Sequence, residues 1–184
     1  MTDAALITRI CAGDQDAAAV LVRRYYDECW RFAYRMTGHR ADTEDIVQET
    51  FLRAFRGLER YQERQLFRAW LFCILVNQCR TVLARRRGSA RFVTGDRIEQ
   101  IAAESDDEPD GAMGWPPEQL ADALQYAIGR LGSQYREAFL LKHAEGMEYT
   151  QMSEITGASI PALKMRVKRA REMLRPLMEE HLRD

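Results

Sequence analysis

The chain has 184 residues, of which 46% are hydrophobic and 30% are charged, and its formal net charge is −1. This length allows one large domain or two small ones, and the apolar content is sufficient for a packed core, which excludes a wholly disordered chain. The sequence has no run of about 20 apolar residues and no basic region followed by an apolar one at its start, so we expect a cytoplasmic protein without membrane insertion.

The small net charge conceals a strong segregation of charge along the chain. Residues 17–87 hold 14 Arg against 8 Asp and Glu, whereas residues 88–118 hold 2 Arg against 8 Asp and Glu. Residues 119–184 hold 10 Lys and Arg against 9 Asp and Glu. We therefore expect a polyanion to be bound by the two ends of the chain and not by its acidic middle.

Residues 1–87 have the apolar periodicity of a helical bundle. We expect helices over residues 3–11, from a cap at Asp14 or Asp16 to about residue 36, over residues 42–55, and over residues 67–87. The polar stretch ERYQERQ between the last two is short enough to be a loop. The final helix ends in three consecutive arginines, residues 85–87, which either balance the helix dipole and aid solubility or contact phosphates.

The helix predicted over residues 42–55 separates an apolar stripe from a polar face. The stripe recurs at steps of three and four residues and consists of Val47, Phe51, Ala54, Phe55 and Leu58. We expect Asp42 or Thr43 to cap its N-terminus and Gly57 to lie near its end. The opposite face carries Glu44, Asp45, Gln48, Glu49 and Arg53. On an isolated helix this face would be a solvated surface, but beside a basic bundle and a second domain we interpret it as a docking surface.

Residues 88–117 are rich in Pro, Gly and acidic residues and are typical of a linker. Helical periodicity returns over residues 118–131, 135–143 and 150–156, with Ser133 as the expected cap of the second of these helices. A long final helix is expected to begin at a Ser159 cap, with Pro161 tolerated in its first turn. The fold class predicted is all-α: two small helical domains, residues 1–87 and 118–184, joined by an acidic linker over residues 88–117.

The last two predicted helices are joined by a short turn that contains Gly157, which is the pattern of a helix-turn-helix motif. The second helix of such a motif lies in the DNA major groove. Its expected inward side is Leu163, Val167, Ala170 and Leu174. Six cations fall within twelve residues of it: Lys164, Arg166, Lys168, Arg169, Arg171 and Arg175. A basic solvated helix end is the alternative for the last two cations, but the whole pattern favours DNA binding.

Two segments of the sequence resemble a known family. DTEDIVQETFLRAF followed by FRAWLFCILVNQCRTVLARRR, and then LGSQYREAFLLKHAEGMEYTQMSEITGASIPALKMRVKRAREMLR, are similar to regions 2 and 4 of bacterial RNA polymerase sigma factors of the extracytoplasmic-function (ECF) group. The resemblance covers roughly residues 14–87 and 118–176. This chain departs from the family pattern at Gly132, at Gln151–Ser153, and at Ala162 and Met165, which bears on the promoter sequence that it prefers.

The resemblance implies an alternative sigma factor that binds core polymerase, recognises the minus-10 and minus-35 promoter elements, and promotes DNA melting and initiation. The implied protein contacts are the clamp helices of the largest polymerase subunit, the beta flap, and a controlling anti-sigma factor. The acidic linker would follow the RNA-exit path. Polymerase binding is assigned to Asp42, Glu44, Asp45, Gln48 and Glu49. Contacts with the minus-10 element are assigned to Tyr61, Gln62, Arg64, Asn77, Arg80, Arg85 and Arg86, with Phe67 as a further stacking candidate. Contacts with the minus-35 element are assigned to Ser159, Ala162, Lys164, Met165, Arg166, Lys168 and Arg169.

Three alternatives remain open from the sequence. A stand-alone helix-turn-helix regulator would leave the polar face of residues 44–49 unexplained, and an inhibitory partner-binding module would leave two DNA-facing motifs unexplained. For an enzyme, the three histidines stand apart from Cys or carboxylates at ligand spacing, and no phosphate loop, nucleophile elbow or HExxH motif occurs. We therefore expect no enzymatic activity, no metal and no cofactor, and we expect the four cysteines to be buried or half-buried free thiols.

Overall fold

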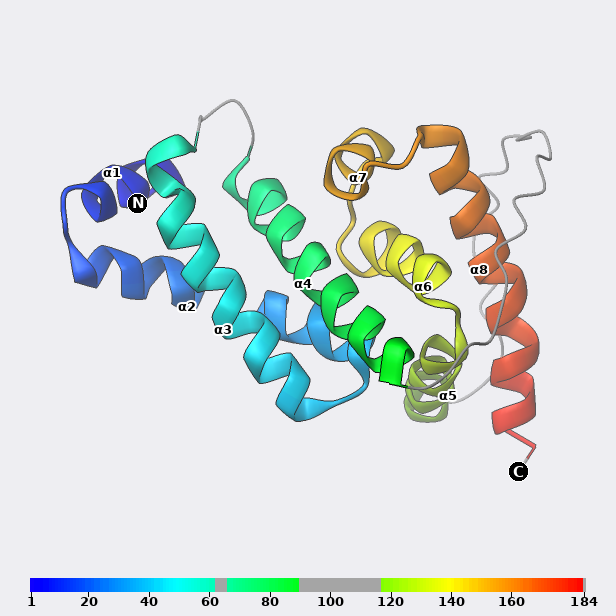
Figure 1. Cartoon of the computed structure of the whole chain (residues 1–184). Coiled ribbons are helices and arrows are strands. Elements are labelled where there is room, and N and C mark those ends of the chain that lie inside the picture. The colour runs from blue at the N-terminus through cyan, green and yellow to red at the C-terminus, as the bar shows by residue number, and fades with distance from the viewer. Residues whose placement is uncertain (62–65, 90–116, 184) are drawn as a thin grey trace. The chain divides into compact units, whose positions relative to one another are not determined.

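The computed structural model describes residues 1–61, 66–89 and 117–183. All regular secondary structure within these ranges is helical (Figure 1). The chain divides into two compact units, one built mainly from helices α1 to α4 and the other mainly from α5 to α8. This confirms the all-α class and the two helical domains. The greater part of the predicted linker, with its composition of Pro, Gly and carboxylates, lies outside the described residues.

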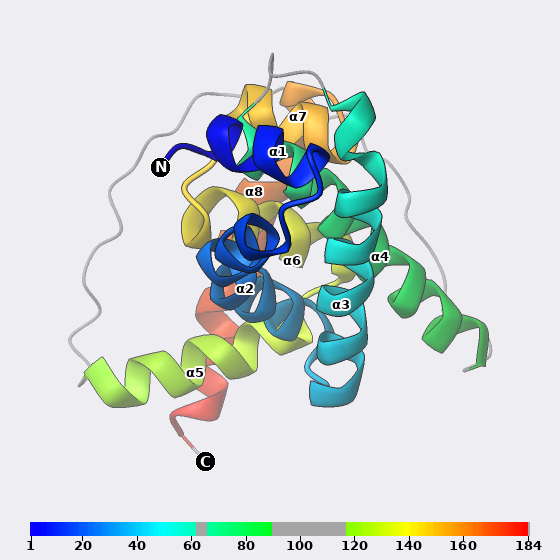
Figure 2. The same cartoon turned by 90° about the vertical axis from the view of Figure 1, so that its left-hand side faces the viewer.

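The first unit contains α1 (Asp3–Cys11), α2 (Gln15–Thr37), α3 (Arg40–Gly57), the short 3-10 helix η1 (Leu58–Arg60) and α4 (Phe67–Ser89). Helix α1 packs on α2 and η1, while α2, α3 and α4 pack against one another, as Figures 1 and 2 show from two directions. Asp14 is the cap of α2, because its carboxylate accepts a hydrogen bond from the Ala17 amide at 3.1 Å. Helix α4 extends two residues beyond its predicted end.

The predicted cap of α3 at Asp42 or Thr43 is wrong. The helix begins at Arg40, and His39 occupies the cap position without a side-chain hydrogen bond to the helix. Gly38 ends α2 in the left-handed conformation, with φ of 66°, so the chain reverses at once and the next helix starts two residues early. The Thr43 hydroxyl instead donates to the carbonyl of His39 at 2.9 Å and lies 3.2 Å from the Thr37 hydroxyl, which closes the turn.

The predicted apolar stripe of α3 is buried at four of its five positions: Val47, Phe51, Ala54 and Leu58. Phe55 is only half-buried, whereas Ile46 and Thr50, which were not assigned to the stripe, are buried. The buried sector is wider than one stripe because α3 is packed on two sides, by α2 and by α4. Thr50 is accommodated there because its hydroxyl donates to the Ile46 carbonyl at 2.7 Å.

The second unit contains α5 (Pro117–Arg130), α6 (Ser133–Phe139), a π-helical turn η2 (Leu140–Ala144), α7 (Tyr149–Thr156) and α8 (Ile160–His181). Helix α8 packs on both α5 and α6. The predicted inward residues of α8 are all buried. Ser159 caps α8 by accepting from the Ala162 amide at 3.4 Å, and Pro161 lies in the first turn, as expected.

The predicted cap at Ser133 is wrong, since Gly132 occupies that position and Ser133 is the first residue of α6. The end of α5 is instead satisfied by Arg136, whose guanidinium donates to the carbonyls of Leu131, at 3.0 Å, and Gly129. Of the cysteines, Cys29 and Cys79 are buried and Cys73 is half-buried, but Cys11 is exposed, contrary to prediction. Leu6 is the buried residue of helix α1, and Cys11, the last residue of this helix, is therefore left exposed.

Candidate functional sites

The outward face of α3 is held in place by ion pairs within the helix. Arg40 pairs with Glu44 at 2.9 Å and Arg53 pairs with Glu49 at 2.6 Å, each four residues apart. Such pairs stabilise a helix by about 0.2–0.5 kcal/mol each and fix the orientation of the side chains. Asp45 and Gln48 are exposed between them. The structure therefore presents the predicted docking face as two carboxylates that are already paired, with an exposed carboxylate and an amide beside them.

Asp42 differs from the other residues assigned to this face. Its side chain is only 22% exposed and lies 2.7 Å from the Arg86 guanidinium near the end of α4, with the His39 ring nitrogen at 3.7 Å. One residue assigned to polymerase binding and one assigned to the minus-10 element thus form an ion pair with each other. The spacing of 44 residues gave no sign of this contact, which depends on the antiparallel packing of α3 and α4.

Three aromatic rings lie together where η1 ends and α4 begins. The ring of Tyr61 is 5.0 Å from that of Trp70 and 5.9 Å from that of Phe67, and the rings of Phe67 and Trp70 are 5.7 Å apart. Phe67 is 3% exposed, so its ring fills the core and could stack on a base only by leaving it. Tyr61 and Trp70 are half-buried. Gln62 and Arg64, also assigned to the minus-10 element, lie outside the described residues.

Gly57 allows the indole of Trp70 to approach α3 closely. A Cβ at this position would lie 3.1 Å from the indole ring, whereas the backbone of Gly57 is right-handed, with φ of −94°, and does not itself require glycine. The glycine therefore serves a close approach rather than a left-handed helix end. Further along α4, Asn77 is exposed and Arg80 is half-buried one turn later, while Arg85 and Arg86 are exposed. These side chains extend along α4 from the aromatic rings towards the helix end.

The start of α8 is strongly basic. Its first twelve residues, 160–171, contain five Lys and Arg and no Asp or Glu. Among the residues assigned to the minus-35 element, Ser159, Lys164 and Lys168 are exposed, and Ala162, Met165, Arg166 and Arg169 are half-buried. A capped helix start with cations on its outer face is suited to phosphates and to base edges in a groove.

Two residues that the sequence analysis did not assign join this basic surface. The ring of Tyr149, at the start of α7, has the Lys164 ammonium at 5.8 Å and the Lys142 ammonium at 4.9 Å. Lys142 belongs to the π-helical turn η2 and also pairs with Glu148 at 3.7 Å. The π-helical turn η2 could not be predicted from periodicity. Tyr149, however, stands at the start of the first helix of the helix-turn-helix motif, and an aromatic residue there could have been recognised as a candidate contact.

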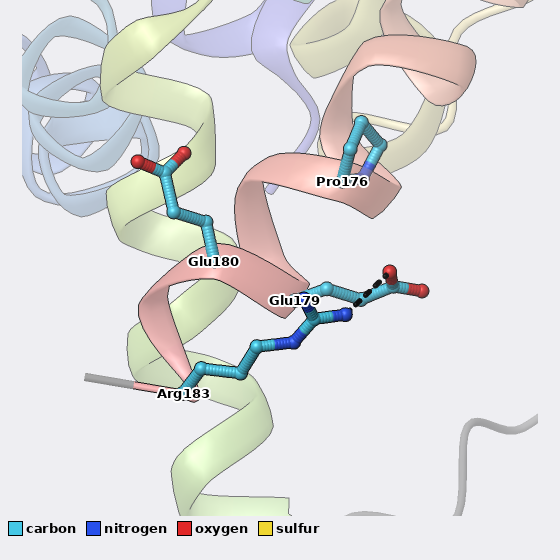
Figure 3. Close-up of a pocket in the computed structure, with 4 residues that line it drawn as sticks. All are labelled: Pro176, Glu179, Glu180 and Arg183. Atoms are coloured by element: carbon cyan, nitrogen blue, oxygen red, sulfur yellow. Dashed lines mark ion pairs between the residues drawn. The ribbon is translucent and has the colours of Figure 1, made fainter.

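A shallow recess at the far end of α8 is lined by Pro176, Glu179, Glu180 and Arg183 (Figure 3). Glu179 accepts a hydrogen bond from Arg175 at 3.3 Å and forms an ion pair with Arg183 at 3.7 Å, so these charges compensate one another. The recess holds no assigned contact residue. Over the described ranges, no group of His, Cys, Asp or Glu is arranged to hold a metal ion. None of the helices in the described part of the chain is both long and apolar enough to cross a bilayer.

Comparisons with known proteins match both units. Residues 21–89 match the Sigma-70 region 2 family, and residues 121–174 match the Sigma-70, region 4 family. The ECF RNA polymerase sigma factor SigE of Mycolicibacterium smegmatis is 32% identical over 173 residues, which cover 92% of this chain and 65% of SigE. The RNA polymerase sigma factor NccH of Alcaligenes xylosoxydans xylosoxydans is 32% identical over 182 residues, which cover 96% of this chain and 95% of NccH.

The fold is likewise shared with a solved structure. The structure of CnrH in complex with the cytosolic domain of CnrY has 26% sequence identity and a TM-score of 0.69, and the match covers 97% of each chain. Two helical units that match regions 2 and 4 of the Sigma-70 family, in that order along the chain, define a transcription initiation factor of the sigma type. The chain belongs to the RNA polymerase sigma factors, in the ECF group. Its function is that of an alternative sigma factor, as the resemblance implied.

Proposed function

We propose that the two units bind different partners through the two surfaces described above. Helix α3 docks on the clamp helices of the largest polymerase subunit, and the start of α8 enters the major groove at the minus-35 element. The observation that supports this division is the contrast in charge: the outward face of α3 presents carboxylates paired with arginines beside an amide, whereas the first twelve residues of α8 contain five cations and no carboxylate.

The docking face on α3 centres on Asp45 and Gln48, which are exposed. Glu44 and Glu49 flank them and keep their intrahelical arginine partners, so they contribute as oriented acceptors. Asp42 orients Arg86 through their ion pair, and it contacts the polymerase only at the edge of the docking face. The second unit makes its own contact, with the beta flap.

The minus-10 element is recognised by the face of the first unit that begins at Tyr61. An unstacked base of the nontemplate strand stacks beside Tyr61 and Trp70, which are half-buried and therefore partly accessible. Extruding a base costs a few kcal/mol, and stacking on an aromatic ring returns about 1–3 kcal/mol per base. Asn77 and Arg80, with Gln62 and Arg64, contact the same strand, while Arg85 and Arg86 contact phosphates.

The minus-35 element is recognised by the N-terminal turns of α8. Ser159, Ala162, Lys164, Met165 and Arg166 face base edges, and Lys168 and Arg169 contact the phosphate backbone. Tyr149 orients Lys164 by lying 5.8 Å from its ammonium, and Lys142 adds a cation on the same side of the motif. Met165 and Ala162 offer apolar contacts, which suit a thymine methyl group.

The mechanism is binding, without covalent chemistry, and it takes place in the cytoplasm. Each unit alone recognises a short element weakly, but a polymerase that holds both units presents them at high effective concentration to elements a fixed distance apart. The acidic connector follows the RNA-exit path. CnrH is bound by the cytosolic domain of CnrY, and we propose that an anti-sigma factor controls this chain by covering its docking and DNA-facing surfaces.

The docking assignment is tested by the double substitution Gln48→Ala and Glu49→Ala. Each lost hydrogen bond to a partner is worth about 0.5–1.5 kcal/mol, so we expect the dissociation constant for core polymerase to rise about tenfold, with unchanged helix content by circular dichroism. The matched control is Arg53→Ala, which breaks the Glu49 ion pair from the other side.

An equal loss of affinity with the Arg53 control would show that the ion pair, and not the docking contact, is responsible. Unchanged affinity in the double variant would refute the assignment of α3. Tight and sequence-specific binding of duplex DNA by the chain without polymerase would contradict the mechanism as a whole.

A further inference from the structure

The N-terminal helix is tied to the first unit by a half-buried polar contact. The Tyr25 hydroxyl donates to the Asp3 carboxylate at 2.5 Å, and the ring of Tyr25 lies in the core at 8% exposure. The other Asp3 oxygen pairs with Arg24, whose guanidinium also donates to the Met1 carbonyl at 2.8 Å. Asp3 therefore supplies the hydrogen-bond partner of a half-buried hydroxyl, and this contact ties α1 to α2.

The ring of Tyr25 continues this contact into the aromatic cluster. It lies 5.4 Å from the ring of Phe67, which in turn contacts Tyr61 and Trp70. The four rings thus form one series, from a fully packed end at Tyr25 and Phe67 to a half-buried end at Tyr61 and Trp70. The half-buried end is where the proposed function places an unstacked base.

The half-buried end is restrained from two directions. Because Gly57 has no side chain, the Trp70 indole packs closely against α3. Helix α1 packs on η1, and Tyr61 is the residue that follows η1. Tilted ring pairs have preferred geometries, so we expect a shift of the Tyr25 ring to change the position of the Phe67 ring that packs on it.

We propose that Asp3 is a positioning residue for minus-10 recognition: through Tyr25 and Phe67 it holds Tyr61 and Trp70 in the orientation that accepts an unstacked base. This inference rests on the proposed minus-10 role of Tyr61. It assigns to the first helix, which makes no DNA contact in the proposed function, a part in promoter selectivity.

The test uses the full-length chain assembled with core polymerase and a pool of promoter-length duplexes randomised across both promoter elements. The bound fraction is sequenced, and the preference for each base is measured at each position. We expect Asp3→Ala and Tyr25→Phe to reduce the minus-10 preference by the same several-fold factor, with no further reduction in the double variant. The minus-35 preference and the affinity for core polymerase should be unchanged. The matched control is Asp16→Ala, which removes an exposed carboxylate from the first turn of α2.

Tyr25→Phe keeps the ring and removes only the hydroxyl, so it decides the question if Asp3→Ala does not fold. A wild-type minus-10 preference in Tyr25→Phe, with or without a lower melting temperature, would show that the contact is merely structural. A wild-type assembly that selects a minus-35 sequence but no minus-10 sequence would overturn the proposed role of Tyr61 and this inference with it.

Discussion

The outward faces of α3 and α8 both carry many ionisable groups, but the two helices arrange them differently. Helix α3 has four Asp and Glu and three Arg, and two of the arginines pair with carboxylates four residues away. The first twelve residues of α8 have five cations and no carboxylate, and the Glu residues of this helix lie towards its other end. The first face is nearly balanced in charge, whereas the second carries a strong local excess.

This difference separates two kinds of recognition. A balanced face with oriented side chains exerts little long-range field, so its partner must match it by shape and by hydrogen bonds at short range. An excess of cations attracts a polyanion over a Debye length, about 8–10 Å in physiological salt, and its affinity falls as salt rises. The outward face of α3 is therefore suited to a defined protein surface, and the basic start of α8 is suited to a polyanion such as duplex DNA.

The largest effect is expected from substitutions that remove cations from the start of α8. Lys164→Ala with Arg166→Ala should weaken binding to the preferred minus-35 sequence by about 1–3 kcal/mol for each side chain that contacts a base, and by less on a scrambled sequence. The measurement is equilibrium binding of the polymerase complex to both duplexes. Arg183→Ala, at the far end of α8 and 3.7 Å from Glu179, is the control and should have little effect. An equal loss on both sequences would place both side chains on the phosphate backbone.

A smaller effect is expected at the ion pair that joins α3 and α4. If Arg86 contacts a phosphate, Arg86→Ala should lower the slope of log K against log salt by about one unit, with a uniform loss of affinity on every promoter. The matched variant is Asp42→Asn, which removes the partner 2.7 Å from Arg86 and should leave that slope intact or steeper. A loss of polymerase affinity in Asp42→Asn as large as that expected for the Gln48 and Glu49 variant would instead return Asp42 to the docking face.

The helices and their buried sides followed from the sequence because period and burial are local properties. Residues at steps of three and four, such as Leu163, Val167, Ala170 and Leu174, must share a face, and that face was buried. The caps predicted at residues 42–43 and at Ser133 were wrong because the choice of cap depends on the conformation of the turn before the helix. Asp, Thr and Ser are good caps anywhere near a helix start, so the sequence does not say which residue takes the position. At α3 the left-handed Gly38 starts the helix early, and at α6 Gly132 itself takes the cap position.

The candidate sites were harder to predict because they depend on contacts between distant residues. Asp42 and Arg86 were assigned to different partners, and only the packing of α3 on α4 pairs them. The burial of Phe67 required the Tyr25 ring from another helix, and the proximity of Lys142 to Tyr149 required a π-helical turn. Exposure of Asp45, Gln48 and Lys164, in contrast, followed directly from their positions opposite the apolar stripes.

The smallest expected effect concerns the alkaline stability of the first unit. Burial raises the pKa of Tyr25 well above its ordinary value, and the hydrogen bond to Asp3 contributes a smaller rise. The folded chain therefore keeps a proton that the unfolded chain loses above about pH 10, so the free energy of unfolding falls as pH rises through that range.

The variant Tyr25→Phe lacks this titration. We expect the stability difference between wild type and variant to shrink between about pH 9 and pH 11, measured by urea unfolding with tryptophan fluorescence, to which Trp30 and Trp70 of this unit contribute. A difference that stays constant with pH would show that the Tyr25 hydroxyl ionises as readily in the folded chain as in the unfolded one, and that the contact with Asp3 does not protect it.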